Sequence, residues 1–129
     1  MDELFALANA SLVLRLIHYL NHTSPVSLQF LTVIYEDSSW LVRLKSADRP
    51  SQSQERDLEA FLWEIGDPCN PQAILREALL DLELGQSPVA VMRQHQIVVI
   101  SHGAPSALEV EIFRRDFIAR LGYTPLTLV

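Results

Sequence analysis

Residues 88–100 read PVAVMRQHQIVVI, and this stretch decides the fold that the sequence predicts. Two short apolar runs, at residues 88–92 and 97–100, are separated by the polar residues 93–96. Short apolar runs around a polar connection are typical of a β-hairpin whose strands lie mostly in a core. We therefore expect a hairpin here and, with it, an antiparallel sheet that the rest of the chain completes and covers.

A helix is predicted directly after this hairpin. Residues 101–105 contain Gly and Pro and break the apolar run, and Ser106 with Glu109 matches a capping box. Gly122 is typical of the end of such a helix. Beyond it, residues 124–129 form either a short final strand or a tail that lies on a neighbour. The expected buried stripe of the helix consists of Val110, Phe113, Phe117 and Leu121.

A second pair of strands is predicted in the first half of the chain. Residues 26–36 are mostly apolar, residues 36–39 form a turn, and residues 40–44 return as a strand. Eleven residues are many for one strand, so residues 26–36 either bend or split in two. One face carries Val26, Leu28, Phe30 and Ile34, and the other carries Ser27, Gln29, Leu31, Val33 and Tyr35.

Three further helices are predicted from apolar periodicity. Residues 2–21 form the first, with a break near residues 9–11 left open. Residues 53–65 carry an i, i+3, i+4, i+7 stripe and end at Gly66. The third is capped by Asn70 and ends before Gly85.

These elements predict a single α+β domain over residues 1–129 in the order α-β-β-α-α-β-β-α, with an optional C-terminal strand. A twisted antiparallel sheet with helices packed mainly on one face fits this order. Residues 1–66 and 71–122 share the order helix, hairpin, helix, Gly. Two explanations stay open: an old αββα duplication, and the fact that Pro and Gly commonly break helices and strands in any unit of this kind.

The charge of the chain is acidic and unevenly placed. The net charge is −6, and the whole surplus of negative charge lies between Glu55 and Glu83. This segment contains eight acidic residues and only two basic ones, Arg56 and Arg76. Such a surplus repels phosphate backbones, so nucleic-acid binding is disfavoured. The hydrophobic fraction of 49% is that of a globular chain.

Cysteine usage and the apolar segments indicate where the protein works. Cys69 is the only cysteine, which excludes an internal disulfide and fits a reducing compartment. The Met-Asp-Glu start lacks the basic residues of a secretory signal. Residues 12–20 include Arg15 and His18 and are too few to span a bilayer. We expect a cytoplasmic protein without a membrane segment.

No motif predicts catalysis, a cofactor or a metal. His18 and His22 have the i, i+4 spacing of two ligands on a helix, but no third ligand is fixed beside them. His102 lies in the segment SHGAP, residues 101–105. The Gly and Pro of this segment are explained by the end of a strand and the start of a helix, so no catalytic role is needed to account for them. Cys69 precedes a predicted helix N-terminus, which can activate a thiol, but Asp67 opposes this.

The run from residue 72 to residue 121, especially residues 88–100 followed by residues 106–121, resembles the type III secretion chaperone fold and its YbjN-like relatives. The resemblance implies a small acidic α+β protein, commonly a homodimer, with helices on one face of a twisted antiparallel sheet. It also implies a partner segment held extended against apolar patches and sheet edges. That family usually has three strands in its first sheet segment, whereas this sequence predicts two unless residues 26–36 split.

The sequence therefore favours a non-enzymatic protein-interaction module, chaperone-like or adaptor-like, that binds another protein or a peptide segment. The first helix is apolar on nearly every side, which favours contact with a partner such as a second copy. Two alternatives stay open: a small-ligand sensor with a pocket lined by Phe30, Trp40 and Phe117, and a small metal-dependent hydrolase using His18, His22 or His102. The predicted interface residues are Leu12, Leu16, Tyr19, Leu20, Leu31, Val33 and Tyr35.

Overall fold

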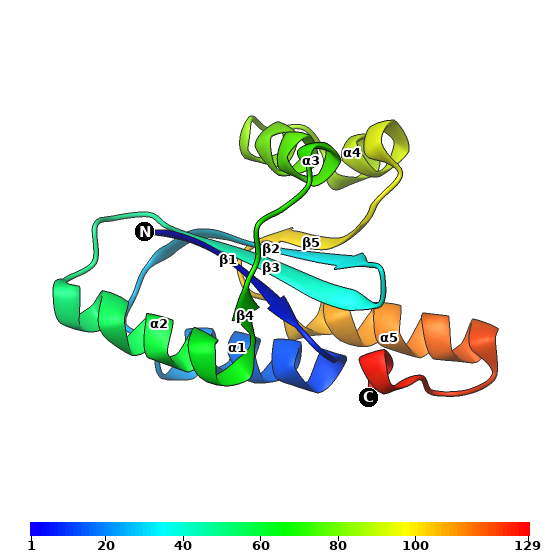
Figure 1. The fold of residues 1–129 in the computed structure, drawn as a ribbon, viewed down its shortest axis with the longest axis horizontal. Coiled ribbons are helices and arrows are strands. Elements are labelled where there is room, and N and C mark those ends of the chain that lie inside the picture. Colours follow the sequence, from blue (N-terminus) through cyan, green and yellow to red (C-terminus); the bar gives the residue numbers. More distant parts are fainter.

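The computed structural model describes residues 1–129 as one five-stranded antiparallel sheet with helices on both of its faces (Figure 1). The spatial order of the strands is β4-β1-β3-β2-β5. The elements along the chain are β1 (Asp2–Leu7), α1 (Ala10–His22), β2 (Leu28–Glu36), β3 (Ser39–Ser46), α2 (Gln52–Ile65), β4 (Asp67–Pro68), α3 (Ala73–Glu83), α4 (Pro88–His95), β5 (Val98–Gly103), α5 (Ala107–Leu121) and the 3-10 helix η1 (Leu126–Leu128). The predicted α+β class and antiparallel sheet are confirmed.

The first residues of the chain form a strand, so the prediction of one helix over residues 2–21 is wrong for its first part. β1 pairs with β3 along its whole length, with Phe5 opposite Val42 and Leu7 opposite Trp40. The helix begins only at Ala10, after Asn9, whose side chain accepts a hydrogen bond from a backbone N–H of the first turn. The break predicted near residues 9–11 is where strand ends and helix starts.

Residues 88–92 are helical, so the predicted second hairpin does not form. Ser87 caps α4 by accepting a hydrogen bond from the Ala90 N–H at 3.1 Å, and Pro88 follows in the first turn. A cap followed by Pro is a favourable helix start because Pro lacks the N–H that would be unpaired there. Gln96, in the left-handed conformation at φ 55°, ends the helix. Only residues 98–103 add a strand, and the second half of the chain therefore does not repeat the αββα order.

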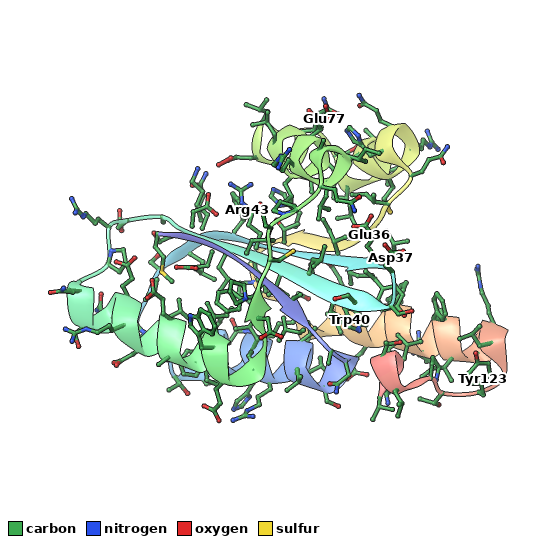
Figure 2. All side chains as sticks on the ribbon, viewed as in Figure 1. Glu36, Asp37, Trp40, Arg43, Glu77 and Tyr123 are labelled. Carbon is green, nitrogen blue, oxygen red and sulfur yellow. The ribbon has the colours of Figure 1, made fainter.

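Two layers of helices enclose the sheet. We call the side covered by α1, α2 and α5 the α1 face, and the side covered by α3 and α4 the α3 face (Figure 1). The α1 face holds a core of 18 buried residues and the α3 face a core of nine. Most of the helices therefore lie on one face, as predicted. Figure 2 shows the alternation along β3, with Trp40 toward α5 and Arg43 toward α3.

The other predicted elements form with small differences. Residues 28–36 make one strand with an irregular register between Leu28 and Phe30, which is the predicted bend. The capping box forms at Ser51 and not at Ser106, which makes no side-chain cap hydrogen bond before α5. α3 begins at Ala73, after Gln72 rather than Asn70.

The C-terminal residues form η1 against the α1 face instead of a strand. The Trp40 indole N–H donates to the Thr127 carbonyl at 2.7 Å, and the Ser11 N–H donates to the Val129 carbonyl at 2.9 Å. Leu128 is fully buried in the larger core. The tail therefore closes one end of that core.

Candidate functional site

Four of the seven predicted interface residues lie inside the protein's own core. Leu16, Leu20, Leu31 and Val33 are buried on the α1 face, so within the single chain they are not exposed for the partner contact that the sequence predicted. The physical reason is that α1 is covered by the sheet on one side and lies beside α5, α2 and η1.

The other three predicted interface residues are half-buried against the same core. The Tyr19 ring stacks on Phe61 with centroids 4.0 Å apart, and the Tyr35 hydroxyl shares a hydrogen bond with Thr127 at 2.9 Å. Leu12 also packs at the rim of this core. The apolar first helix is thus explained by burial within the chain.

The three histidines considered as ligands do not come together. His18 and His22 are exposed on α1, with ring centroids 4.4 Å apart. His102 lies on the opposite face of the sheet, where its Nδ1 shares a hydrogen bond with the Thr32 hydroxyl at 2.7 Å. Burial lowers the pKa of His102, and nearby Arg43 lowers it further. These positions do not form a shared metal or catalytic site.

The pocket predicted between Phe30, Trp40 and Phe117 is also divided by the sheet. Phe30 packs on the α3 face, 4.7 Å from the His102 ring and beneath Arg43. Trp40 is buried on the α1 face, and Phe117 lines a groove on that side. The three side chains therefore cannot line one cavity.

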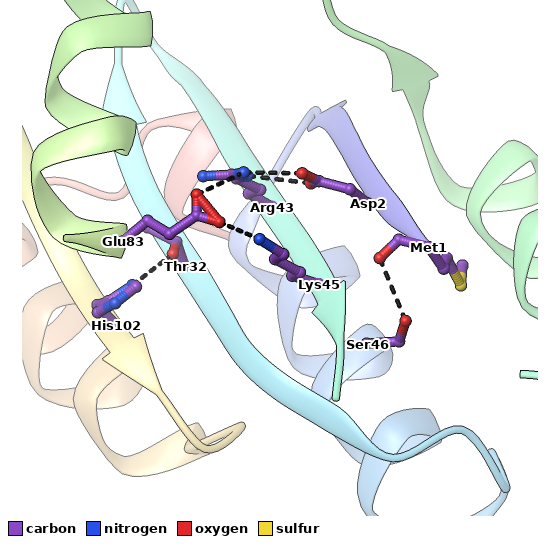
Figure 3. A network of polar contacts seen from close by, with 8 residues as sticks. All are labelled: Met1, Asp2, Thr32, Arg43, Lys45, Ser46, Glu83 and His102. Atoms are coloured by element: carbon purple, nitrogen blue, oxygen red, sulfur yellow. Dashed lines mark hydrogen bonds and ion pairs between the residues drawn. The ribbon is translucent and has the colours of Figure 1, made fainter. Parts of the chain in front are cut away.

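A network of charged side chains joins α3 to the sheet (Figure 3). Arg43 donates to both carboxylate oxygens of Asp2, at 3.0 and 2.7 Å, and to Glu83 at 3.4 Å. Lys45 also pairs with Glu83. The hydrogen bond from Arg43 lowers the pKa of Asp2, and the one from Lys45 lowers the pKa of Glu83. Every charge here has a partner within the chain, and the network fixes the end of α3 over β3.

Three carboxylates gather between β1 and α2. Oxygens of Glu3, Glu55 and Glu59 lie within 4.8 Å of one another. Burial raises the pKa of Glu3 to about 7, helped by a hydrogen bond with Glu59 and by repulsion from both neighbours. No cation in the chain pairs with this cluster, so protonation is what relieves its repulsion.

We expect this cluster to make folding stability depend on pH. The folded protein holds the Glu3 proton more tightly than the unfolded chain, whose pKa is near 4.5. This stabilisation is fully present below pH 4.5 and is lost as the pH rises through 7. Because the cluster is partly exposed and screened, we expect a loss of only about 1 kcal/mol in the free energy of unfolding.

Urea unfolding of Glu3→Gln at pH 5 to 8 measures this loss. As the pH rises, the unfolding free energy of the wild type should fall by the amount that Glu3 contributes, and the variant should not show this contribution. Glu77→Gln is the matched control, because Glu77 points outward from α3 and has no ion pair (Figure 2). Equal pH slopes in the wild type and Glu3→Gln would contradict the assignment.

Cys69 is not arranged as a reactive thiol. It is half-buried after β4, and its N–H donates to the Leu4 carbonyl at 2.9 Å. Burial raises the pKa of its thiol, with a further contribution from Glu36. A raised thiol pKa opposes nucleophilic reactivity.

The feature that sequence reasoning missed is the free edge of β5. This strand pairs only with β2 and lies at the end of the sheet. No loop or turn hydrogen bond involves the backbone of residues 98–103. An edge strand presents a row of unpaired N–H and C=O groups, which can pair with another chain. The opposite edge differs, because the short β4 covers part of β1 there.

An apolar groove runs beside this edge, between β5 and α5. Its volume is about 440 Å³, and seven of its ten lining residues are hydrophobic. Val98 is 40% exposed and Ile112 is 39% exposed, so both walls present apolar surface to solvent. The lining residues are Met92, Val98, Val99, Ile100, Glu109, Ile112, Phe113, Asp116, Phe117 and Arg120.

α5 supplies the other wall because its apolar residues outnumber those that the core can cover. Only Val110 of this helix is buried, whereas Phe113 and Phe117 are half-buried. The predicted burial is therefore correct for Val110. It was overestimated for the half-buried Phe113 and Phe117 and is wrong for Leu121, which is exposed. The uncovered apolar surface of α5 is what makes the groove hydrophobic.

No protein-family description matches this chain, and no curated protein sequence matches it. A crystal structure of the C-terminal domain of YpbH has a similar fold, with a TM-score of 0.51 and 14% sequence identity. The similarity covers 89% of this chain and 97% of that domain. At this identity the comparison concerns the fold alone, and the resemblance to type III secretion chaperones stays a prediction. None of the helices combines the length and the apolar character that crossing a membrane requires.

Proposed function

We propose that this chain is a non-enzymatic protein-interaction module that binds an extended segment of another protein as an added strand along β5. The observation that carries the proposal is the free edge of β5 beside the apolar groove with α5. In this mode of recognition, main-chain hydrogen bonds give affinity and pockets for alternate side chains give selectivity. Holding a segment extended in this way would suit a chaperone-like or adaptor-like role, which we place in the cytoplasm as part of this proposal.

The geometry of the groove fits such a segment. Alternate side chains of an added strand would point to the α1 face, where Ile112 and Phe117 offer apolar contacts beside Val98. The intervening side chains would point to the α3 face, near Met92 of α4. We therefore expect a ligand with apolar residues at alternate positions rather than a helical one.

The placement of the polar groups supports a binding role over catalysis. Arg43 and Lys45 are paired with carboxylates, and His102 is bonded to Thr32. His95 Nε2 and an oxygen of Asp81 lie 2.7 Å apart and join α4 to α3. The charged and polar groups near the sheet thus connect elements of the fold to one another.

Selection from a library of random 12-residue peptides tests the proposal. The protein is kept dilute, and the selected peptides are then synthesised and their affinities measured. We expect peptides with apolar residues at alternate positions. Methylating alternate backbone nitrogens of such a peptide should abolish binding for one set of positions and leave the other set tolerated, because only one set faces β5.

A variant and a matched control localise the binding. Ile112→Asp places a charge in the groove wall and should weaken peptide binding at least about tenfold, the loss of one anchor contact. Leu108→Asp changes the same helix at a site that is 67% exposed and outside the groove, and should bind as the wild type does. Failure to select any peptide, or equal binding by Ile112→Asp, would overturn the proposal.

A further inference from the structure

The groove side of α5 carries opposite charges at its two ends. Glu109 lies in the first turn and Arg120 in the last, and both line the groove. They are 11 positions apart, which is three helical turns, so they lie on one side of the helix about 16 Å from each other. Ile112 and Phe117 lie between them on the same wall.

These two charges have no partner within the chain. The other charges of α5 do: Arg114 lies 4.0 Å from Glu111, and Arg115 lies 3.7 Å from Asp116. Arg114 also donates to a carbonyl of the C-terminal tail. Glu109 and Arg120 make neither an ion pair nor a side-chain hydrogen bond.

The direction of the chain makes this arrangement self-complementary. After β5 the chain turns and α5 runs back along the strand in the opposite direction (Figure 1). A two-fold axis that pairs β5 with β5 of a second copy in antiparallel fashion therefore also sets the two α5 helices antiparallel. Such an interface is isologous, so that each contact occurs twice. When the axis passes level with the middle of α5, Glu109 of each copy faces Arg120 of the other, and Ile112 faces Phe117.

We infer that a second copy of this chain occupies the groove, joined edge to edge through β5 and held by two Glu109–Arg120 ion pairs. The pairing forms one continuous sheet and covers the apolar wall of α5 on both copies. This inference is linked to the proposed function only because the second copy and the partner segment would use the same groove. The two would therefore compete for it. Separation of the pair is then the step that opens β5 to a partner segment.

A charge-swap experiment tests this pairing. Mass is measured by light scattering behind gel filtration over a range of protein concentrations. The wild type should form a dimer, and Glu109→Arg or Arg120→Glu alone should weaken it about tenfold, because each variant turns two attractions into two repulsions. The double variant Glu109→Arg/Arg120→Glu should restore the dimer to within about threefold, because the swapped pairs attract again.

Controls separate association from folding. Both reversals oppose the helix dipole, so the double variant has the least favourable α5, and its recovery of dimer cannot come from a more stable helix. Glu111→Arg, on the same helix but outside the groove, should leave the dimer unchanged. A wild type that stays monomeric at every concentration, or a double variant no better than either single one, would overturn the inference.

The outcomes for this inference and for the proposed function are distinguishable. A charge-swap rescue without any selected peptide would keep the dimer and remove the peptide-binding function. The opposite outcome is a chain that is always monomeric but binds peptides, with methylation tolerated at only one of the two sets of positions. That outcome would keep the peptide-binding function and remove the dimer. If both hold, adding the peptide should convert dimer to monomer in the same light-scattering measurement.

Discussion

Trp40→Ala is expected to lower the free energy of unfolding by about 4 kcal/mol. The Trp40 side chain is fully buried on the α1 face, and its ring meets the edges of Tyr35 and Phe113 at centroid distances of 5.1 and 5.7 Å. Its N–H also holds the Thr127 carbonyl. The alanine variant therefore leaves a large cavity and releases the tail that closes the core.

Urea unfolding measured by circular dichroism gives this value. Trp40→Phe keeps an aromatic ring in the core and removes the N–H, so it should cost only about 1 to 2 kcal/mol. Both variants lack the hydrogen bond to Thr127, so the difference between them measures the packing that a phenyl ring retains in this core. A cost below about 1 kcal/mol for Trp40→Ala would contradict the packing of this cluster.

Leu16→Ala is expected to cost about 3 kcal/mol of unfolding free energy. Leu16 is fully buried between α1 and the sheet, and the surrounding core leaves little room to collapse around the missing atoms. Because the contact is within one chain, the cost of unfolding the monomer should not depend on protein concentration.

Leu12→Ala is the matched comparison, since Leu12 lies on the same helix and is only half-buried. It should cost about 1 kcal/mol or less. If Leu16→Ala instead changed the association state while leaving the unfolding of the monomer intact, α1 would be an interface and its burial in the core would be wrong.

The central elements of the fold could be predicted from sequence because their signals are local. Asp37 and Ser38 adopt φ of 50° and 59°, which is the two-residue turn that a polar run between strands favours. The helices α2 and α3 show clear apolar stripes and end near Gly66 and Gly85.

β1 could not be predicted, because its residues favour a helix in isolation. Glu3, Leu4 and Ala6 belong to residue types with good helix propensity. The strand forms because β3 lies beside it and both of its faces are covered, with Phe5 in the larger core and Leu4 against the smaller one. Long-range pairing of this kind overrides local preference.

The candidate site was missed for a related reason. A short apolar run such as residues 88–92 is compatible with a buried strand or a buried helix, and the Ser87-Pro88 start was the signal that could have decided it. Assigning a strand there gave β5 a partner and concealed its free edge. The groove with α5 then had no place in the predicted sheet.

The position of β1 in the sheet also constrains the order in which the chain can fold. β1 is held between β3 and β4, both of which follow it in sequence, and its main partner is complete only at Ser46. The β2–β3 hairpin needs only its own tight turn, so it is the natural nucleus, and β1 joins afterwards. During synthesis the apolar residues Phe5 and Leu7 therefore emerge well before β3, which covers them in the fold, and the chain passes through a stage in which this apolar segment is unpaired.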